Sequence, residues 1–198
     1  GARADRRGAR GARASRGAED TIAVEVARFE LASADELPRE ADELVVSVDM
    51  PNLPDELWTK RVRIDERGRS HAFAFEHAVD VRAGSKARAE LMDALESASR
   101  EDSAVIFTVC TVDLQAKPGA APQPLGTCEL NLEELLDAAR ADALGERLTV
   151  LSADGRKRRV GTLVVSVRAL AALREIDAAL ERHGGAAGAK RAEAALCL

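Results

Sequence analysis

The stretch QPLGTCELNLEELL, residues Gln123–Leu136, places a glycine before an alternating run and an acidic, leucine-rich segment after it. Alternation is the period of a half-buried strand, and the spacing that follows Leu132 is that of a short helix. A second Gly-Thr pair lies near the start of the run RVGTLVVSVRAL, Arg159–Leu170. We expect Gly126 and Gly161 to lie where a strand bends or passes close to a neighbour, because a side chain would obstruct such an approach.

On both sides of these two runs, strand patterns joined by turns fill most of the chain. Their number and spacing predict an all-β antiparallel sandwich of about eight strands. Helical patterns with leucine stripes accompany them, so two or three short helices are expected. The strand patterns are Ile22–Leu31, Glu43–Met50, Trp58–Asp65, Ser70–His77, Ser103–Asp113, Thr127–Leu132, Glu146–Ser152 and Arg159–Leu170. The helical patterns are Ser85–Ala98, Asn131–Arg140 and Ala169–Gly185.

The periodicity also assigns faces within these segments. The first strand slips by one residue between Val26 and Phe29, which predicts a β-bulge. The segment Ser103–Asp113 is apolar on both faces, so we expect a central strand covered on both sides, with Phe107 buried. Ser85 is expected to cap the first helix. Three further sets of residues are each expected to lie on one face of their element. In the third strand these are Trp58, Lys60, Val62 and Ile64. In the first helix they are Ala87, Leu91, Leu95 and Ala98, with Met92 beside them, and in the last helix Leu170, Leu173, Ile176 and Leu180.

The composition is that of a globular domain between less ordered segments. Hydrophobic residues make up 46% and charged residues 32% of the chain, which permits a packed core. Both ends are rich in glycine, alanine and basic residues without periodicity, so we expect one domain at 21–183 between disordered segments at 1–20 and 184–198. The net charge of −5 argues against a nucleic-acid binder, because phosphate neutralisation requires clustered lysine and arginine. No apolar run approaches the ~20 residues of a membrane span.

Residue types that carry catalysis or bind metals form no recognisable motif. The histidines His71, His77 and His183 have spacings that suit no zinc site. The chain also lacks a nucleophile elbow and a glycine-rich phosphate loop with its lysine. Cys110 and Cys128 lie inside apolar strand patterns, where a free cysteine acts as a small hydrophobe in a reducing compartment. The sequence therefore predicts an intracellular protein with no catalytic residues and no cofactor.

The order of the segments resembles a C2 domain, because a strand opening with L-G-T is followed by a short helix, a strand, a hairpin and V-G-T-L-V-V-S-V. Together with the upstream segments ELVVSVDMPNLPDE, ARAELMDALES and EDSAVIFTVCTVD, they look like the C-terminal domain of the retinitis pigmentosa GTPase regulator-interacting protein (fantom) family, over Thr21 to Ile176. The resemblance implies a C2-like sandwich that is a non-catalytic, protein-binding module. It further implies a cytoplasmic scaffold at the ciliary transition zone or basal body. The implied partner is a GTPase-regulator-type protein or another transition-zone protein.

Calcium binding by a C2 domain requires several carboxylates that converge from loops at one end, because the ion takes 6–8 oxygen ligands. The loops after Val48 and after Val112 would contribute Asp49 and Asp113. One carboxylate per loop is too few, and a lone aspartate at a strand end usually forms a turn. We therefore predict no calcium or other metal site.

A basic patch offers the alternative of membrane binding. The patch consists of four arginines on the outer face and the turn of the third and fourth strands, as in C2 domains that bind anionic lipids. A solvent-exposed charged face is the simpler interpretation, because Asp65, Glu66 and Glu76 lie nearby. The patch residues are Arg61, Arg63, Arg67 and Arg69.

Overall fold

The computed structural model describes residue 17 and residues 19–51, 53–65, 68–117, 119–137 and 142–182. Within them, nine strands form one antiparallel sheet in the order β3-β2-β6-β7-β8-β9-β1-β5, with β4 also pairing to β2. The strands are β1 Thr21–Leu31, β2 Glu43–Asp49, β3 Leu57–Trp58, β4 Val62–Arg63, β5 Ser70–Asp80, β6 Ala104–Val112, β7 Gln123–Asn131, β8 Ala143–Ser152 and β9 Arg159–Arg168. The helices are α2 Lys86–Glu96, α3 Leu132–Asp137 and α4 Leu170–Arg182, with short 3-10 turns η1 Ala34–Glu36 and η2 Arg100–Ser103.

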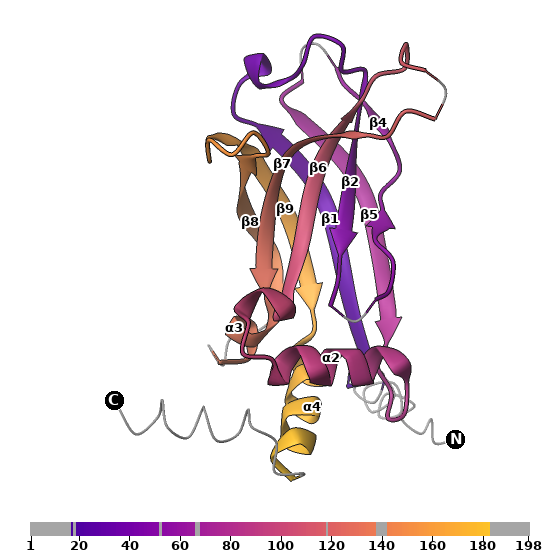
Figure 1. Cartoon of the computed structure of the whole chain (residues 1–198), viewed down its shortest axis with the longest axis vertical. Coiled ribbons are helices and arrows are strands. Elements are labelled where there is room, and N and C mark those ends of the chain that lie inside the picture. The colour runs from indigo at the N-terminus through magenta and orange to yellow at the C-terminus, as the bar shows by residue number, and fades with distance from the viewer. Residues whose placement is uncertain are drawn as a thin grey trace, which may run out of the picture.

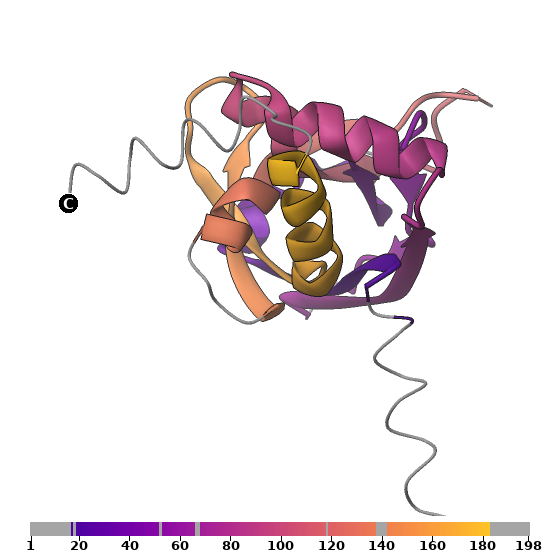
Figure 2. The ribbon, with the colours of Figure 1, turned by 90° about the horizontal axis from the view of Figure 1, so that it is seen from below.

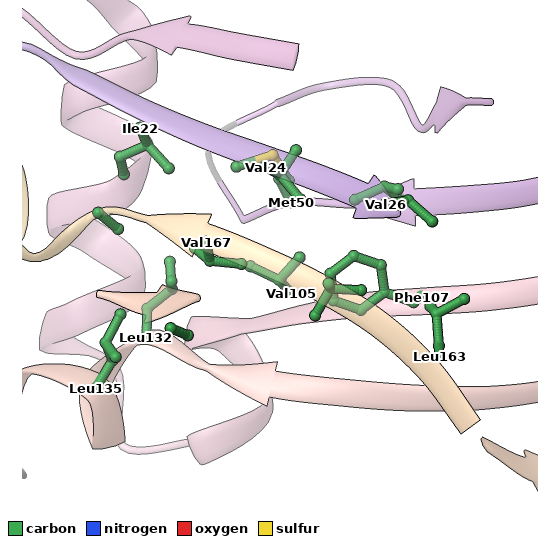
Figure 3. Packing of buried hydrophobic residues seen from close by; sticks show 14 of the residues in the cluster. Ile22, Val24, Val26, Met50, Val105, Phe107, Leu132, Leu135, Leu163 and Val167 are labelled. Carbon is green, nitrogen blue, oxygen red and sulfur yellow. The ribbon is translucent and has the colours of Figure 1, made fainter. Parts of the chain in front are cut away.

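The sheet curls so that its two halves face each other around one core (Figures 1 and 2). Alternation in β1 drives this packing, because Ile22, Val24 and Val26 all point inward and are fully buried. Figure 3 shows these side chains on one side of the core and Val105 and Phe107 of β6 on the other. The predicted all-β antiparallel sandwich with short helices is confirmed, and so is the burial of Phe107.

The helices close one end of the sandwich. Viewed from below, α4 crosses the opening between the two halves and α2 runs along one side (Figure 2). The predicted inner face of α4 is confirmed, since all four of its expected residues are buried: Leu170, Leu173, Ile176 and Leu180. Helix α2 is fastened to α4 by Arg88, which forms an ion pair with Glu175 and donates a hydrogen bond of 3.4 Å to the Val81 carbonyl oxygen.

Both Gly-Thr glycines lie at close approaches between strands, as predicted. A Cβ at Gly126 would lie 2.9 Å from methyl carbons of Val150 and Val160. A Cβ at Gly161 would lie 2.5 Å from the ring of Phe29 and 2.6 Å from the Glu30 carbonyl oxygen. Real Cβ atoms essentially never come this close to other heavy atoms, so a side chain at either position would push the strands apart.

Two further local predictions hold. The register of β1 shifts between Val26 and Arg28 against both of its neighbours, which is the predicted bulge. The Ser85 side chain caps α2 by accepting a 3.2 Å hydrogen bond from the Arg88 backbone N–H.

The predicted third strand is wrong, because two short strands, β3 and β4, replace it. Thr59 interrupts the ladder by accepting a 3.0 Å hydrogen bond from the Val46 backbone N–H through its side-chain oxygen. The break reverses the alternation, so Trp58 is 45% exposed whereas Val62 and Ile64 pack against the core. Alternation alone cannot reveal such a break, because it assumes an uninterrupted pleat.

Two assignments of faces also need correction. In the first predicted helix, the buried positions are Arg88, Leu91 and Leu95, while Ala98 lies beyond the helix and is exposed. On β6, the outer face is covered only in part. Cys110 and Val112 are buried there in a small second cluster with Val45, and Ile106 and Thr108 are half-buried.

Candidate functional site: the cleft between strands β7 and β8

Strands β7 and β8 pair over a very short length. Their ladder consists of Gly126 with Ser152 and Thr127 with Leu151, at the end of the sandwich away from the helices. Below these pairs, residues 128–131 of β7 and 143–150 of β8 have no partner strand on the sides that face each other. Figure 1 shows α3, which follows β7 in the chain, at the lower end of the two strands. Strands β7 and β8 therefore separate below their ladder. The wedge between them is bounded at one end by the ladder and at the other end by α3.

Two adjoining hollows occupy this wedge, and we call them together the β7–β8 cleft. The larger, of about 640 Å³, reaches from β7 and β8 to α3 and Arg100. The smaller, of about 350 Å³, continues upward to Leu151. Both are lined by Glu129 of β7 and Leu148 of β8, so they form one groove. Its size is within the range typical of ligand-binding clefts.

The cleft combines an apolar floor with an acidic rim. Leu130 and Leu148 are half-buried and pack against the core, so the edge of the core is reachable from the cleft. On the rim, Glu134 forms an ion pair with Arg100. Glu129 and Glu146 are exposed and have no ion-pair partner among the described residues.

Two side chains that sequence reasoning missed hold the ends of the elements around the cleft. Asn131 donates hydrogen bonds of 2.7 Å to the Arg100 carbonyl oxygen and 3.0 Å to Ser103 Oγ, and its own oxygen accepts one of 2.9 Å from the Glu134 N–H. Asp142 accepts bonds from the backbone N–H groups at the start of α4. Asparagine is a common N-cap residue, and Asn131 directly precedes α3, so this signal could have identified it. Asp142 lies far from α4 in the sequence and gives no such local signal.

The two aspartates considered for calcium do not come together. Asp49 ends β2 opposite Ile106, whereas Asp113 follows Val112, which pairs with Glu43 at the start of β2. The two aspartates therefore lie at opposite ends of the β2–β6 pair. The expectation that both loops meet at one end is therefore wrong. Asp113 instead accepts a 2.7 Å hydrogen bond from the Gln115 backbone N–H, as a turn former does. Among the described residues, no three His, Cys, Asp or Glu side chains are grouped to hold a metal ion.

The arginine patch is broken up by acidic neighbours. Arg61 lies 3.9 Å from the Glu43 carboxylate, and Arg63 of β4 is the cross-strand neighbour of the same glutamate. Arg69 precedes β5, and its carbonyl oxygen accepts a 2.8 Å hydrogen bond from the Leu31 N–H. Arg67 lies outside the described residues. The three described arginines are exposed, so a charged surface is present at this end of the molecule.

Burial shifts the pKa values of two cysteines and one histidine in the direction that favours their neutral forms. Burial raises the pKa of the Cys110 thiol to about 11 and that of Cys128 to about 12. Both cysteines thus act as small hydrophobes, as the strand patterns indicated. Burial lowers the pKa of His71, against the opposing effects of Asp65 and of a backbone hydrogen bond with Arg63. None of the helices within the described ranges has the length and apolar character of a membrane span.

Comparison with known proteins places the chain in a family. The family described as retinitis pigmentosa G-protein regulator interacting C-terminal matches residues 18–179. In a direct comparison with curated proteins, no match is found. Among solved structures, CC2D1B is similar with a TM-score of 0.53 and 18% identity. The match covers 80% of this chain but spans only 59% of that one. This likeness shows the fold, which is C2-like.

Two further structures with C2 domains are more distant. A C2 domain-containing protein from a putative elicitor-responsive gene has a TM-score of 0.46 and 11% identity, over 74% of this chain and 85% of that one. The C2A domain of plant Extended Synaptotagmin 1 has a TM-score of 0.44 and 13% identity, over 75% and 92% of the two chains.

Proposed function

Because the chain belongs to the retinitis pigmentosa G-protein regulator interacting C-terminal family, we propose that it is a non-catalytic module that binds a protein partner within a ciliary scaffold. The partner is a GTPase-regulator-type protein or another protein of the transition zone, and the location is the cytoplasm at the transition zone or basal body. The observation that carries this proposal is the family match over residues 18–179, which takes in nearly all of the folded part. We propose residues 21–183 as one domain. The predicted disordered segments, 1–20 and 184–198, lie almost entirely outside the described residues.

Binding to the partner is proposed to be independent of calcium. The placement of Asp49 and Asp113 at opposite ends of the β2–β6 pair supports this, because a calcium site needs carboxylates that converge. C2-type loops without a metal-binding role are available as contact surfaces, and sheet edges are a common place for a partner segment to dock.

The test is calorimetry of the purified chain with a purified β-propeller of the GTPase-regulator type. We expect saturable binding of the same affinity in calcium and in chelator, and none to an unrelated propeller of similar size. Absence of binding to the regulator-type propeller would contradict the proposed partner. Affinity that depends on micromolar calcium would contradict calcium independence.

Anionic-lipid binding is the second candidate, and the exposed Arg61, Arg63 and Arg69 favour it. Surface arginines attract anionic headgroups with an energy that falls at high salt. Sedimentation with phosphatidylserine vesicles tests it, using Arg61→Glu/Arg63→Glu against Arg39→Glu/Arg174→Glu, which changes the charge equally at exposed arginines elsewhere. Loss of sedimentation in the first variant alone would establish lipid binding by the patch. Equal behaviour of the two variants would exclude it.

A further inference from the structure

The edge of β8 is unusually open for a strand of its length. Only Ala143 and Val150 of its ten residues are buried, whereas β9 beside it is buried everywhere except at its two ends. Residues 143–150 pair with β9 on one side and face the cleft on the other. Exposed edge strands present unpaired N–H and C=O groups to which another strand can add.

Apolar side chains beside this edge give an added strand something to pack against. Among the described residues, two of the four exposed large hydrophobic side chains, Leu144 and Leu151, lie on β8. Half-buried Leu130 and Leu148 line the cleft and are continuous with the core. Leu130 and Leu148 share the inner face of the sheet, because their cross-strand neighbours Val105 and Leu163 both belong to the core. These two side chains favour a segment that places an apolar side chain at every second residue, because alternate side chains of a strand share one face.

The charge of the cleft selects a basic partner. Exposed Glu129 and Glu146 line the cleft from its two opposite strands and have no ion pair within the described part of the chain. The Arg100 guanidinium is already paired with Glu134, so it does not neutralise them. A lysine or arginine that approaches this rim is attracted from both sides.

We propose that the β7–β8 cleft binds an extended segment of a partner protein, which adds as a strand to the free edge of β8. Its apolar side chains pack against Leu130 and Leu148 on the inner face of the sheet, and its alternate lysine or arginine side chains lie on the outer face with Glu129. Glu146, on the inner face beside Leu148, adds negative charge to the rim of the cleft. The proposal rests on the proposed protein-binding function and names the surface and the chemistry of the partner segment.

Protection of a bare edge against aggregation is the competing explanation for the charges on β8. Charged side chains and bulges do blunt edges, and β8 carries both, with a register shift between Ala143 and Glu146. Protection does not require half-buried leucines to line the cleft, however. It also does not require that the second unpaired carboxylate, Glu129, come from the facing strand.

The test uses the full chain and a fluorescein-labelled peptide of alternating lysine and valine, about seven residues long to match a typical strand. Anisotropy measures its affinity for the native chain, for Glu129→Lys/Glu146→Lys, and for the milder Glu129→Gln/Glu146→Gln. The matched control is Glu40→Lys/Glu96→Lys, which changes the charge equally at exposed glutamates outside the cleft. Thermal unfolding verifies that each variant is folded.

The expected result is saturable binding that weakens about tenfold or more in the lysine variant of the cleft, several-fold in the glutamine variant, and little in the control. Loss of one screened ion pair weakens binding by up to about fivefold, and charge reversal adds repulsion. A second peptide with a central proline should bind much more weakly, because it lacks a backbone N–H for the ladder. Hydrogen exchange should slow in residues 143–150 when the first peptide binds.

Other outcomes would overturn the proposal. These are absence of binding, equal weakening in the control, or equal binding of the proline peptide. A self-association of the chain that only the cleft variants abolish would make a second copy the occupant. Peptide binding that appears only after residues 1–16 are removed would make that arginine-rich segment the occupant.

The same variants separate this proposal from the proposed function. If a regulator-type propeller binds the native chain and the Glu129→Lys/Glu146→Lys variant equally, the protein-binding function stands and the cleft is not its site. If the peptide results are as expected but no regulator-type propeller binds, the cleft is supported as a peptide-binding site and the proposed partner is contradicted.

Discussion

Strand β8 is joined to its two neighbours in very different ways. On one side the ladder with β9 runs from Ala143 to Leu151, and Arg147 adds a 2.5 Å ion pair to Glu30 of β1, one strand further on. On the other side only Leu151 and Ser152 pair with β7. We call the long β8–β9 ladder the closed seam, and the boundary between β7 and β8, with its two paired positions, the open seam.

A glycine determines where β7 and β8 come close enough to pair. The β7 backbone approaches β8 at Gly126, the point at which a side chain would overlap Val150 and Val160. Farther along β7 side chains return, and the two strands separate toward α3. The sandwich is therefore held together at this side mostly by the core behind it rather than by backbone hydrogen bonds.

Truncation of the core behind the open seam should have the largest effect. Phe107 of β6 is fully buried and is the cross-strand neighbour of Cys128, where β7 has left β8. We expect Phe107→Ala to lower the free energy of unfolding by about 3–5 kcal/mol, because a cavity replaces the ring. Urea denaturation measures it, with Trp58→Ala as the exposed aromatic control, which should cost less than about 1 kcal/mol. An equal loss in the free energy of unfolding for the two variants would mean that core packing does not stabilise this side of the sandwich.

Adding a side chain at the closure point should have the next largest effect. Gly126→Val is expected to destabilise the fold by about 1–3 kcal/mol, because the new methyl groups overlap Val150 and Val160. The matched control is Thr127→Val at the adjacent, exposed position, which should change stability by less than about 0.5 kcal/mol. A neutral Gly126→Val would show that the two strands are not in close approach there.

Hydrogen exchange should distinguish the two seams in the native protein. Residues 161–167 of β9 lie between ladders on both sides and are buried, so their amides should exchange at least about tenfold more slowly than those of residues 143–150 on average. Mass spectrometry of peptic fragments resolves the two segments. Indistinguishable protection in the absence of any partner would mean that the edge of β8 is covered, which contradicts an open seam.

The smallest effect concerns pH and the ion pair that reinforces the closed seam. Hydrogen bonds from Arg147 and then Arg28 lower the pKa of Glu30 from 4.5 to about 2. A carboxyl group with a depressed pKa in the folded state contributes stability above its unfolded value, and this contribution is lost as the pH falls from about 4.5 toward 2. Unfolding of Glu30→Gln should therefore depend less steeply on pH in this window. A parallel pH dependence in the two proteins would contradict the role of the pair.

Local features were predictable from the sequence because each depends on a few adjacent residues. The bulge after Val26 follows from a slipped alternation, the Ser85 cap from the residue before a helix, and the buried face of α4 from its 3.6-residue period. The close approaches at Gly126 and Gly161 were also predictable, since glycine inside a strand pattern usually marks such a place. The candidate site was not, because Glu129 and Glu146 are ordinary exposed glutamates in the sequence.

An antiparallel sandwich with short helices could be predicted from the amino-acid sequence, because alternation, turns and glycine positions are encoded locally and agree with one another. Its C2-like character was indicated by the order of the segments, through a resemblance. The tertiary structure alone decided which strand ends meet. It placed Asp49 and Asp113 at opposite ends, broke one strand at Thr59, and brought Glu129 and Glu146 to the two sides of one cleft. Pairing between distant strands is governed by register and by core packing over the whole molecule, and no local period carries that information.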